Sequence, residues 1–301
     1  MTWRRMFLAG LVLWLLTAGV TYLTGNPLLI PTLVLLGSFL VPVTFVAWAF
    51  ARRDSGEITA ELVFGTFVVG GVLGVLGASA LEAYLLIPSV WMYVGVGLIE
   101  EAVKLGALAL LTRHLAVKSV RDGMILGASV GFGFSAFESA GYALTSLFTA
   151  SGLSLSNLVT TELLRGLLAP VGHGLWTAIL GGTLFAWSTR RHFVLTWRLL
   201  LAFLGVSLLH ALWDSMSMIA VLVTLALTGE PWQYEVLLRG AVPEPTPTQV
   251  TAYTVTNWLG LALISVVGLL WLWSSVRRSH RGTRVPSRVH RVRTGPLAGS
   301  I

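Results

Sequence analysis

Residues 97–112 read GLIEEAVKLGALALLT, an apolar run that contains Glu100, Glu101 and Lys104. A charged side chain at the centre of a bilayer costs roughly 2.5–3.5 kcal/mol, even on the scale derived from insertion experiments. A purely structural role rarely justifies that cost. The stretch therefore indicates a membrane helix that takes part in a polar site inside the protein.

The same feature recurs in three later apolar segments, each with ionisable residues near its middle. These residues are Glu138, His173, His210 and Asp214. Along a helix that rises about 1.5 Å per residue, Glu100 and these four lie roughly 18–24 Å from the inner ends of their spans. Scattered packing residues would have no reason to share a depth, so we expect these side chains to form one site.

The composition also places the chain among membrane proteins. Hydrophobic residues make up 55% of its 301 residues and charged residues only 11%, whereas a soluble domain has about 25% charged residues. We expect an all-α polytopic helical bundle over residues 1–276, with about eight transmembrane helices of roughly 20 residues each. The spans are expected at about 6–24, 28–50, 59–81, 85–112, 122–147, 160–188, 198–225 and 253–275. The first span is expected to be retained rather than cleaved as a signal peptide.

The distribution of basic residues predicts the orientation. With the N-terminus inside, 17 of the 20 Lys and Arg residues fall on the inner side, and Arg239 alone falls in an outer loop. The positive-inside rule therefore favours an N-in and C-in topology. The tail at 277–301 holds seven arginines and no acidic residue. We expect it to be a disordered cytoplasmic segment that is attracted to anionic lipid, rather than to nucleic acid.

Helical spacing links several of the ionisable residues. Lys104 follows Glu100 by four positions and Glu101 by three, so its ammonium can reach either carboxylate. His210 and Asp214 are also four positions apart, and the carboxylate can orient the imidazole or share a ligand with it.

Small residues and a proline predict where helices approach or break. Gly123, Gly127 and Gly131 recur every four residues, which is typical of a face for close helix packing. That face would bring the helix of Glu138 against a neighbour. His173 lies between two glycines, three residues after Pro170, where a loosened helix would admit backbone or substrate.

Charge and residue type limit the chemistry. The four carboxyls and Lys104 leave a formal charge of about −3 if the histidines are neutral, so protonated carboxyls, charged histidines or a bound cation must compensate. The chain has no cysteine, so a metal would need His, Asp or Glu ligands. Outside this set, Arg165 and Glu162 are three positions apart and predict a mutual or interfacial pair, and Glu82 is expected at the interface.

These residues resemble a known family. Glu100-Glu101-Ala-Val-Lys104 looks like the EExxK motif of PrsW-type intramembrane proteases, and Phe134-Ser-Ala-Phe-Glu138 resembles their FxxxE element. His173 and His210-Ala-Leu-Trp-Asp214 are similar to the histidine motifs that follow. The order and spacing agree over residues 85–225, which we interpret as a protease-like core.

The related superfamily of CAAX-prenyl endopeptidases and bacteriocin-processing enzymes (CPBP) has EExxxR, FxxxH and HxxxN elements. Here Lys104 lies one position earlier than that arginine, Glu138 replaces the histidine, and Asp214 replaces the asparagine. These departures favour the PrsW branch over prenyl-protein processing.

The resemblance implies an intramembrane endopeptidase of a bacterial plasma membrane, with a membrane-spanning anti-sigma factor as its substrate. Glu100 or Glu101 would then be the general base for water attack on a peptide bond. His210 and Asp214, with His173, would stabilise the oxyanion or hold the water. The remaining residues would have supporting roles: Glu138 positions water or a histidine, Lys104 holds the glutamate pair, and Phe134 supports the site.

The sequence leaves more than one possibility open for the cofactor and for the class of function. The enzyme would use either no cofactor or a divalent metal such as Zn²⁺, with Glu101, Glu138, His173 and His210 as candidate ligands. Midplane carboxylates and histidines also form proton relays, so a proton- or cation-coupled transporter is an alternative function. A non-catalytic protein that binds membrane segments is a third. Inverted repeats would favour the transporter, and the sequence shows no convincing internal repeat.

Overall fold

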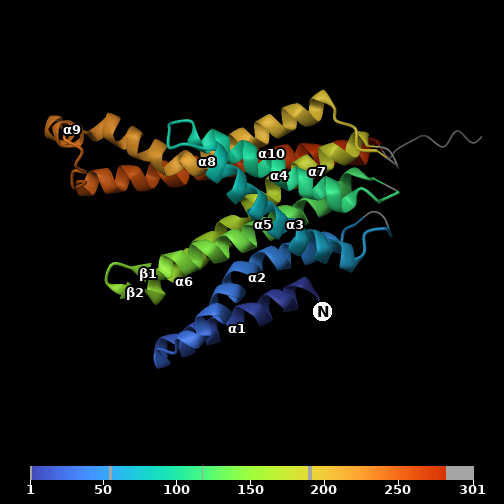
Figure 1. The fold of residues 1–301 in the computed structure, drawn as a ribbon, viewed down its shortest axis with the longest axis horizontal. Coiled ribbons are helices and arrows are strands. Elements are labelled where there is room, and N and C mark those ends of the chain that lie inside the picture. Colours follow the sequence, from blue (N-terminus) through green and yellow to red (C-terminus); the bar gives the residue numbers. More distant parts are fainter. Residues whose placement is uncertain (1, 54–55, 117, 189–191, 283–301) are drawn as a thin grey trace, which may run out of the picture.

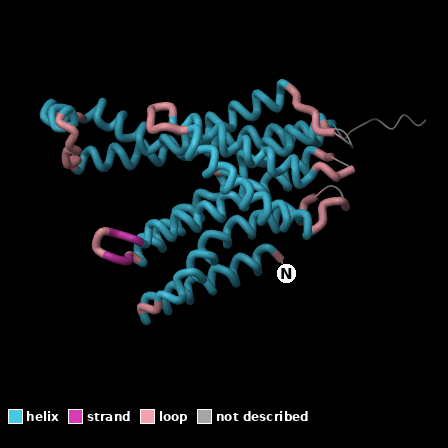
Figure 2. Tube along the Cα trace, in the orientation of Figure 1, coloured by secondary structure: helices cyan, strands magenta, loops and turns pink. Residues whose placement is uncertain are grey.

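Long helices make up nearly all of the chain that the computed structural model describes, which is residues 2–53, 56–116, 118–188 and 192–282. Figure 2 shows that the strands within these residues are confined to one short hairpin. It consists of β1 (Phe148–Thr149) and β2 (Gly152–Leu153), which pair antiparallel. The predicted all-α class is therefore confirmed for the described residues.

The helices follow the predicted spans closely. In chain order they are α1 (Trp3–Thr24), α2 (Ile30–Phe50), α3 (Ala60–Leu85), α4 (Met92–Thr112), α5 (Val120–Leu147), α6 (Leu155–Leu168), α7 (His173–Trp187), α8 (Trp197–Thr228), α9 (Pro231–Leu238) and α10 (Pro247–Gly282), with 3-10 turns η1 (Pro27–Leu29) and η2 (Ala169–Val171). The sixth predicted span is divided, because η2 separates α6 from α7. Pro170 lies in this turn and His173 begins α7, so the helix is interrupted where the proline and glycines predicted only a loosening.

Six helical segments of the described residues are long and apolar enough to cross a membrane, and one of them joins α6 to α7. The chain is thus an integral membrane protein. Helices α4 and α5 are not among the six, although their 21 and 28 residues span about 31 and 42 Å. Helix α4 holds three charged residues of the predicted site, Glu100, Glu101 and Lys104, and α5 holds Glu138. The count of eight spans stays a prediction.

Helix α5 lies at the centre of the bundle in Figure 1, with α7, α3 and α2 packed against it. A Cβ atom at Gly123, Gly127 or Gly131 would overlap backbone atoms of Gly181, Thr177 or His173 in α7. The prediction that these glycines form a packing face is therefore confirmed. Their close approach carries the start of α7, and with it His173, onto the helix that holds Glu138.

Figure 1 places the N-terminus and the end of α10 at the same end of the bundle, together with the loops that follow α2, α4 and α7. The opposite end carries the hairpin and α9. This arrangement agrees with termini on one side, but the side of the membrane that this end faces stays a prediction. Helix α10 continues to Gly282, past the predicted start of the tail at 277. The rest of the tail, 283–301, lies outside the described residues.

Candidate active site

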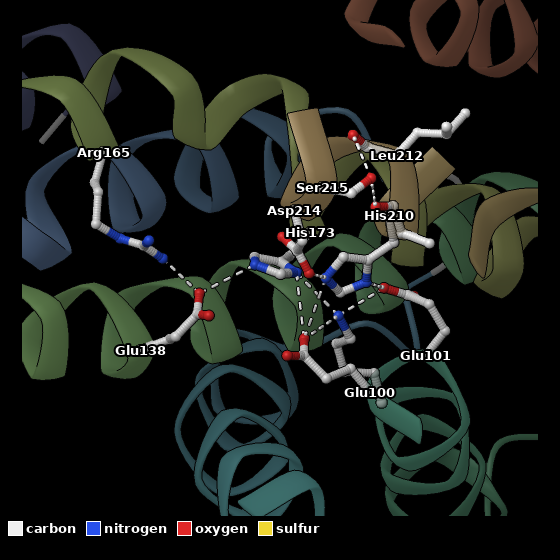
Figure 3. A network of polar contacts seen from close by, with 11 residues as sticks. Glu100, Glu101, Glu138, Arg165, His173, His210, Leu212, Asp214 and Ser215 are labelled. Carbon is white, nitrogen blue, oxygen red and sulfur yellow. Dashed lines mark hydrogen bonds and ion pairs between the residues drawn. The ribbon is translucent and has the colours of Figure 1, made fainter. Parts of the chain in front are cut away.

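Four helices bring the six predicted site residues into one polar network, which Figure 3 shows from close by. The residues are Glu100 and Glu101 on α4, Glu138 on α5, His173 on α7, and His210 and Asp214 on α8. Lys104, the predicted partner of the glutamate pair, lies in the same network. The shared depth inferred from the sequence thus corresponds to spatial proximity.

Lys104 is fully buried at the centre of the network. Its Nζ lies 2.6 Å from Glu101 Oε1, 3.0 Å from His173 Nδ1 and 3.4 Å from Glu100 Oε2. An ammonium has three donors and no acceptor, so these three contacts use all of its hydrogens. His173 Nδ1 must then be the acceptor, which leaves its ring hydrogen on Nε2.

The His210 ring lies between three carboxylates. Its Nδ1 is 3.0 Å from Glu101 Oε1, while its Nε2 is 3.3 Å from Asp214 Oδ2 and 3.5 Å from Glu100 Oε2. Trp176 packs against the ring with centroids 4.7 Å apart. His210 is 1% exposed, so the three carboxylates and Trp176 hold the ring in one position.

Glu138 is held from two directions. His173 Nε2 lies 3.1 Å from Glu138 Oε2, and Arg165 of α6 forms an ion pair with the same oxygen. Arg165 Nε also donates to Ser139 Oγ at 2.7 Å, and its guanidinium lies 4.3 Å from the centroid of the Tyr142 ring. Figure 3 shows the Glu138 carboxylate between the guanidinium and the histidine.

Phe134, the other supporting residue of the predicted motif, packs beneath the polar groups. Its ring centroid lies 4.4 Å from Lys104 Nζ and 5.1 Å from the centroid of the His173 ring. The ring therefore closes one side of the ammonium, where water would otherwise compete for its hydrogens.

A cavity of about 420 Å³ reaches the network. Glu100, Glu138 and Asp214 line it, whereas Glu101 does not. Its other lining residues come from α3, α4 and α5: Val75, Ala78, Ser79, Glu82, Tyr93, Val96, Phe134 and Tyr142. Of the two adjacent glutamates, Glu100 is the one that a substrate or a water in this cavity can meet.

Three described residues could hold a metal ion. Glu100, His173 and His210 each offer a ligand atom, and these atoms lie within 4.8 Å of one another. The predicted ligands Glu101 and Glu138 are engaged elsewhere, the former by Lys104 and His210 and the latter by Arg165 and His173.

The position of Lys104 disagrees with a metal ion at this place. Glu100 Oε2 and His173 Nδ1 are 3.8 Å apart. An ion at the Zn–N bond length of about 2.1 Å from both would lie within about 3.5 Å of Lys104 Nζ, which is 3.4 and 3.0 Å from these two atoms. At an effective dielectric constant of 20, the repulsion would be on the order of 10 kcal/mol. The ion would also compete with the Lys104 ammonium for the same two atoms, so the residues do not fit a divalent metal while Lys104 holds this position.

Arg165 and Glu82 also belong to the site, although the sequence patterns placed both of them elsewhere. Arg165 contacts Glu138, and the predicted mutual pair with Glu162 does not form, because Glu162 accepts from Trp14 Nε1 at 2.7 Å instead. Glu82 lines the cavity. Arg165 changes the charge balance of the network to about −2 with neutral histidines. The sequence assigned no cation to Glu138, and this missing partner was the signal that could have identified Arg165.

Comparison with known proteins adds an independent finding. The sequence model of the PrsW family of intramembrane metalloproteases matches residues 58–238. The chain is also 26% identical over 179 residues to the protease PrsW of Halalkalibacterium halodurans, across 58% of this chain and 78% of that protein. No solved structure matches. All of the residues in the network lie within the matched segment.

Proposed function

This chain belongs to the PrsW family of intramembrane metalloproteases and is a peptide hydrolase, and we propose that it cleaves a membrane-anchored protein with Glu100 as the general base. The observation that carries this proposal is the cavity, which Glu100 lines and Glu101 does not. A general base must come within hydrogen-bond reach of the water that it activates.

In the reaction that we infer, Glu100 takes a proton from a water as the oxygen attacks the scissile carbonyl carbon. The carbonyl becomes an oxyanion, and its collapse expels the amine, which receives the proton from Glu100. Asp214 lines the cavity with Glu100, where it can orient the water and the substrate carbonyl, and the enclosed His210 ring contacts both carboxylates and holds them in place. Lys104 holds both glutamates in place and is itself enclosed by acceptors.

The substrate is proposed to be a membrane-anchored protein, and the family resemblance suggests an anti-sigma factor in a bacterial plasma membrane. The cavity lining runs from Glu100 to Glu82 and Tyr93, beside the loop at 86–91. With the N-terminus inside, this loop faces the outer side, so the substrate would enter the site from there. Because the chain has no cysteine, Ser89→Cys offers a single thiol in this loop. Labelling by an impermeant maleimide in intact cells is expected, and labelling only after lysis would contradict this orientation.

The experiment that tests the function is cleavage of a panel of single-span proteins by the purified enzyme in proteoliposomes. Glu100→Gln is expected to lower the rate by about 10²–10⁴, the usual cost of losing a general base. The matched control is Glu61→Gln, which changes an exposed glutamate in the first turn of α3. Equal rates for the two variants would refute Glu100 as the base, and no cleavage by the wild type of any panel member would refute the proposed substrate class.

A further inference from the structure

A guanidinium enters the polar network from a helix that carries no other site residue. Arg165 lies in the last turn of α6, just before η2 interrupts the span. We infer that Arg165 is a positioning residue of the proteolytic reaction, which holds Glu138 and, through Glu138, the ring of His173. The inference rests on the proposed function, because it assigns a role within the same site.

The contacts of Arg165 all lie on one stretch of α5. It pairs with Glu138 Oε2, donates from Nε to Ser139 Oγ at 2.7 Å, and stacks over Tyr142. A planar guanidinium presents its donors in a fixed fork. Its Nε donates to Ser139 and its flat face lies over the Tyr142 ring, so the remaining N–H groups point toward the Glu138 carboxylate.

The effect reaches His173 through a shared oxygen. Glu138 Oε2 is the acceptor for both Arg165 and His173 Nε2, the latter at 3.1 Å. His173 is the first residue of α7. The rings of Phe134, Trp176 and His210 pack around its imidazole, and each ring nitrogen has one close polar contact that helps to orient it. Lys104 supplies one of them at Nδ1. Glu138 supplies the other, and its position depends on Arg165.

Two cavities show why Glu138 needs this restraint. A second cavity, of about 90 Å³, is lined by Arg165 and His173 and shares Glu138, Tyr142 and Asp214 with the larger one. The Glu138 side chain therefore forms part of the wall between them, with space on both sides. Without the guanidinium, the carboxylate can turn away from His173 into either space, and the imidazole loses its second contact.

A purely structural role for Arg165 would be to tie α6 to α5. The two roles differ in what they change. A tie affects insertion and unfolding temperature, whereas a positioning residue changes the turnover number and the state of His173 in protein that remains folded. In wild-type protein we expect His173 to be the tautomer with its hydrogen on Nε2, because Nδ1 accepts from Lys104.

The test compares Arg165→Gln and Arg165→Lys with Arg198→Gln in proteoliposomes. Arg198 is a matched control because it also stacks on aromatic rings, those of Trp187 and Trp197, at a distance from the network. We expect Arg165→Gln to lower kcat about 10- to 100-fold, the range known for losing a partner that orients a histidine in metal sites, with KM changed less than about twofold. Arg165→Lys, which keeps one charged donor, should recover part of the loss.

Two further measurements separate this inference from the proposed function. First, ¹⁵N NMR of histidine-labelled protein should show His173 Nε2–H hydrogen-bonded to Glu138 in the wild type and a shifted Nε2 resonance in Arg165→Gln, whether or not the protein is active. Second, Arg165→Gln added to Glu138→Gln should lower kcat little further, because both act through one oxygen.

Unchanged kcat and an unchanged His173 spectrum in Arg165→Gln would overturn the positioning role, whereas an active Glu100→Gln variant would overturn only the proposed base. If Arg165→Gln fails to insert, the His173 spectrum can be compared in Arg165→Lys and Ser139→Ala instead. The positioning role then requires a shifted His173 spectrum in Arg165→Lys and a smaller shift in Ser139→Ala, and wild-type spectra in both would refute it.

Discussion

The two halves of the polar network differ in their access to the cavity. The enclosed half consists of Glu101, Lys104 and His210, whose side chains are at most 1% exposed. The cavity half consists of Glu138, Arg165 and Asp214, whose side chains are 21–27% exposed. Glu100 contacts the first half and lines the cavity with Glu138 and Asp214 of the second, whereas Arg165 lines the smaller cavity beside it.

This difference separates stability from catalysis. Removing one partner of a buried ion pair leaves an uncompensated charge and costs about 3–5 kcal/mol, whereas partly exposed pairs are worth much less. The enclosed half therefore acts as a fixed scaffold, and the cavity half meets the substrate. Substitutions in the first should affect folding, and substitutions in the second should affect turnover.

The largest effect is expected for Lys104→Met. The change leaves Glu101 buried without its cation, so the protein should lose about 3–5 kcal/mol of stability along with all activity. Unfolding in detergent micelles measures the loss. The control is Lys118→Met, at a residue whose ammonium donates to the Leu115 carbonyl in a loop. If the two variants unfold at the same temperature, the enclosed half is not a scaffold.

Glu138→Gln should show the opposite behaviour. The amide keeps the shape of the side chain and an acceptor for Arg165, so stability should change by less than about 1 kcal/mol. The turnover number should fall about 10- to 100-fold, because His173 loses its charged partner. Steady-state kinetics and thermal unfolding of the same preparation measure both. If the variant unfolds readily but keeps its turnover number, Glu138 serves stability rather than catalysis, and the proposed division between the halves is wrong.

A small effect is expected from removing metal ions. The Lys104 ammonium lies beside two of the three candidate ligand atoms, so a chelator should leave cleavage close to its starting rate. Elemental analysis of the purified protein should find no stoichiometric zinc. Loss of activity with a chelator, followed by recovery with zinc, would show that Lys104 leaves this place in the working enzyme.

No effect on cleavage is expected from truncating the chain after Arg278. The site residues all precede residue 215, and two arginines remain to anchor the last span. The truncation removes five arginines, each worth about 1 kcal/mol near an anionic surface, so binding to vesicles with anionic lipid should weaken. A truncated protein that inserts normally but cannot cleave would show that the tail recognises the substrate.

Most of the fold follows from hydropathy and from a few special residues. Pro170 and the glycines around His173 predicted a loosened helix at this point, because a proline removes a helix hydrogen bond, and the structure goes further by dividing the span into α6 and α7. The orientation in the membrane depends on charge counting, and the described helices do not test it. Packing against neighbouring helices explains how α4 can hold Glu100, Glu101 and Lys104, because all three are buried in the bundle.

The site was less predictable where helix packing determines which of two adjacent residues faces the cavity. Spacing showed that Lys104 can reach Glu100 and Glu101, but adjacent residues on a helix point about 100° apart. Only the packed helices determine which one lines the cavity. Arg165 was missed for a similar reason. Its spacing from Glu162 suggested a local pair, and the sequence offers no signal that Trp14 would bind Glu162 instead.

The most direct test of the account is the turnover number of Glu100→Gln beside that of Glu101→Gln, on one substrate and in one preparation of proteoliposomes. Both changes remove a single carboxylate from neighbouring positions, and only Glu100 lines the cavity. The account expects a loss of about 10²–10⁴ for Glu100→Gln and a loss at least about tenfold smaller for Glu101→Gln. An inactive Glu101→Gln beside an active Glu100→Gln would contradict it.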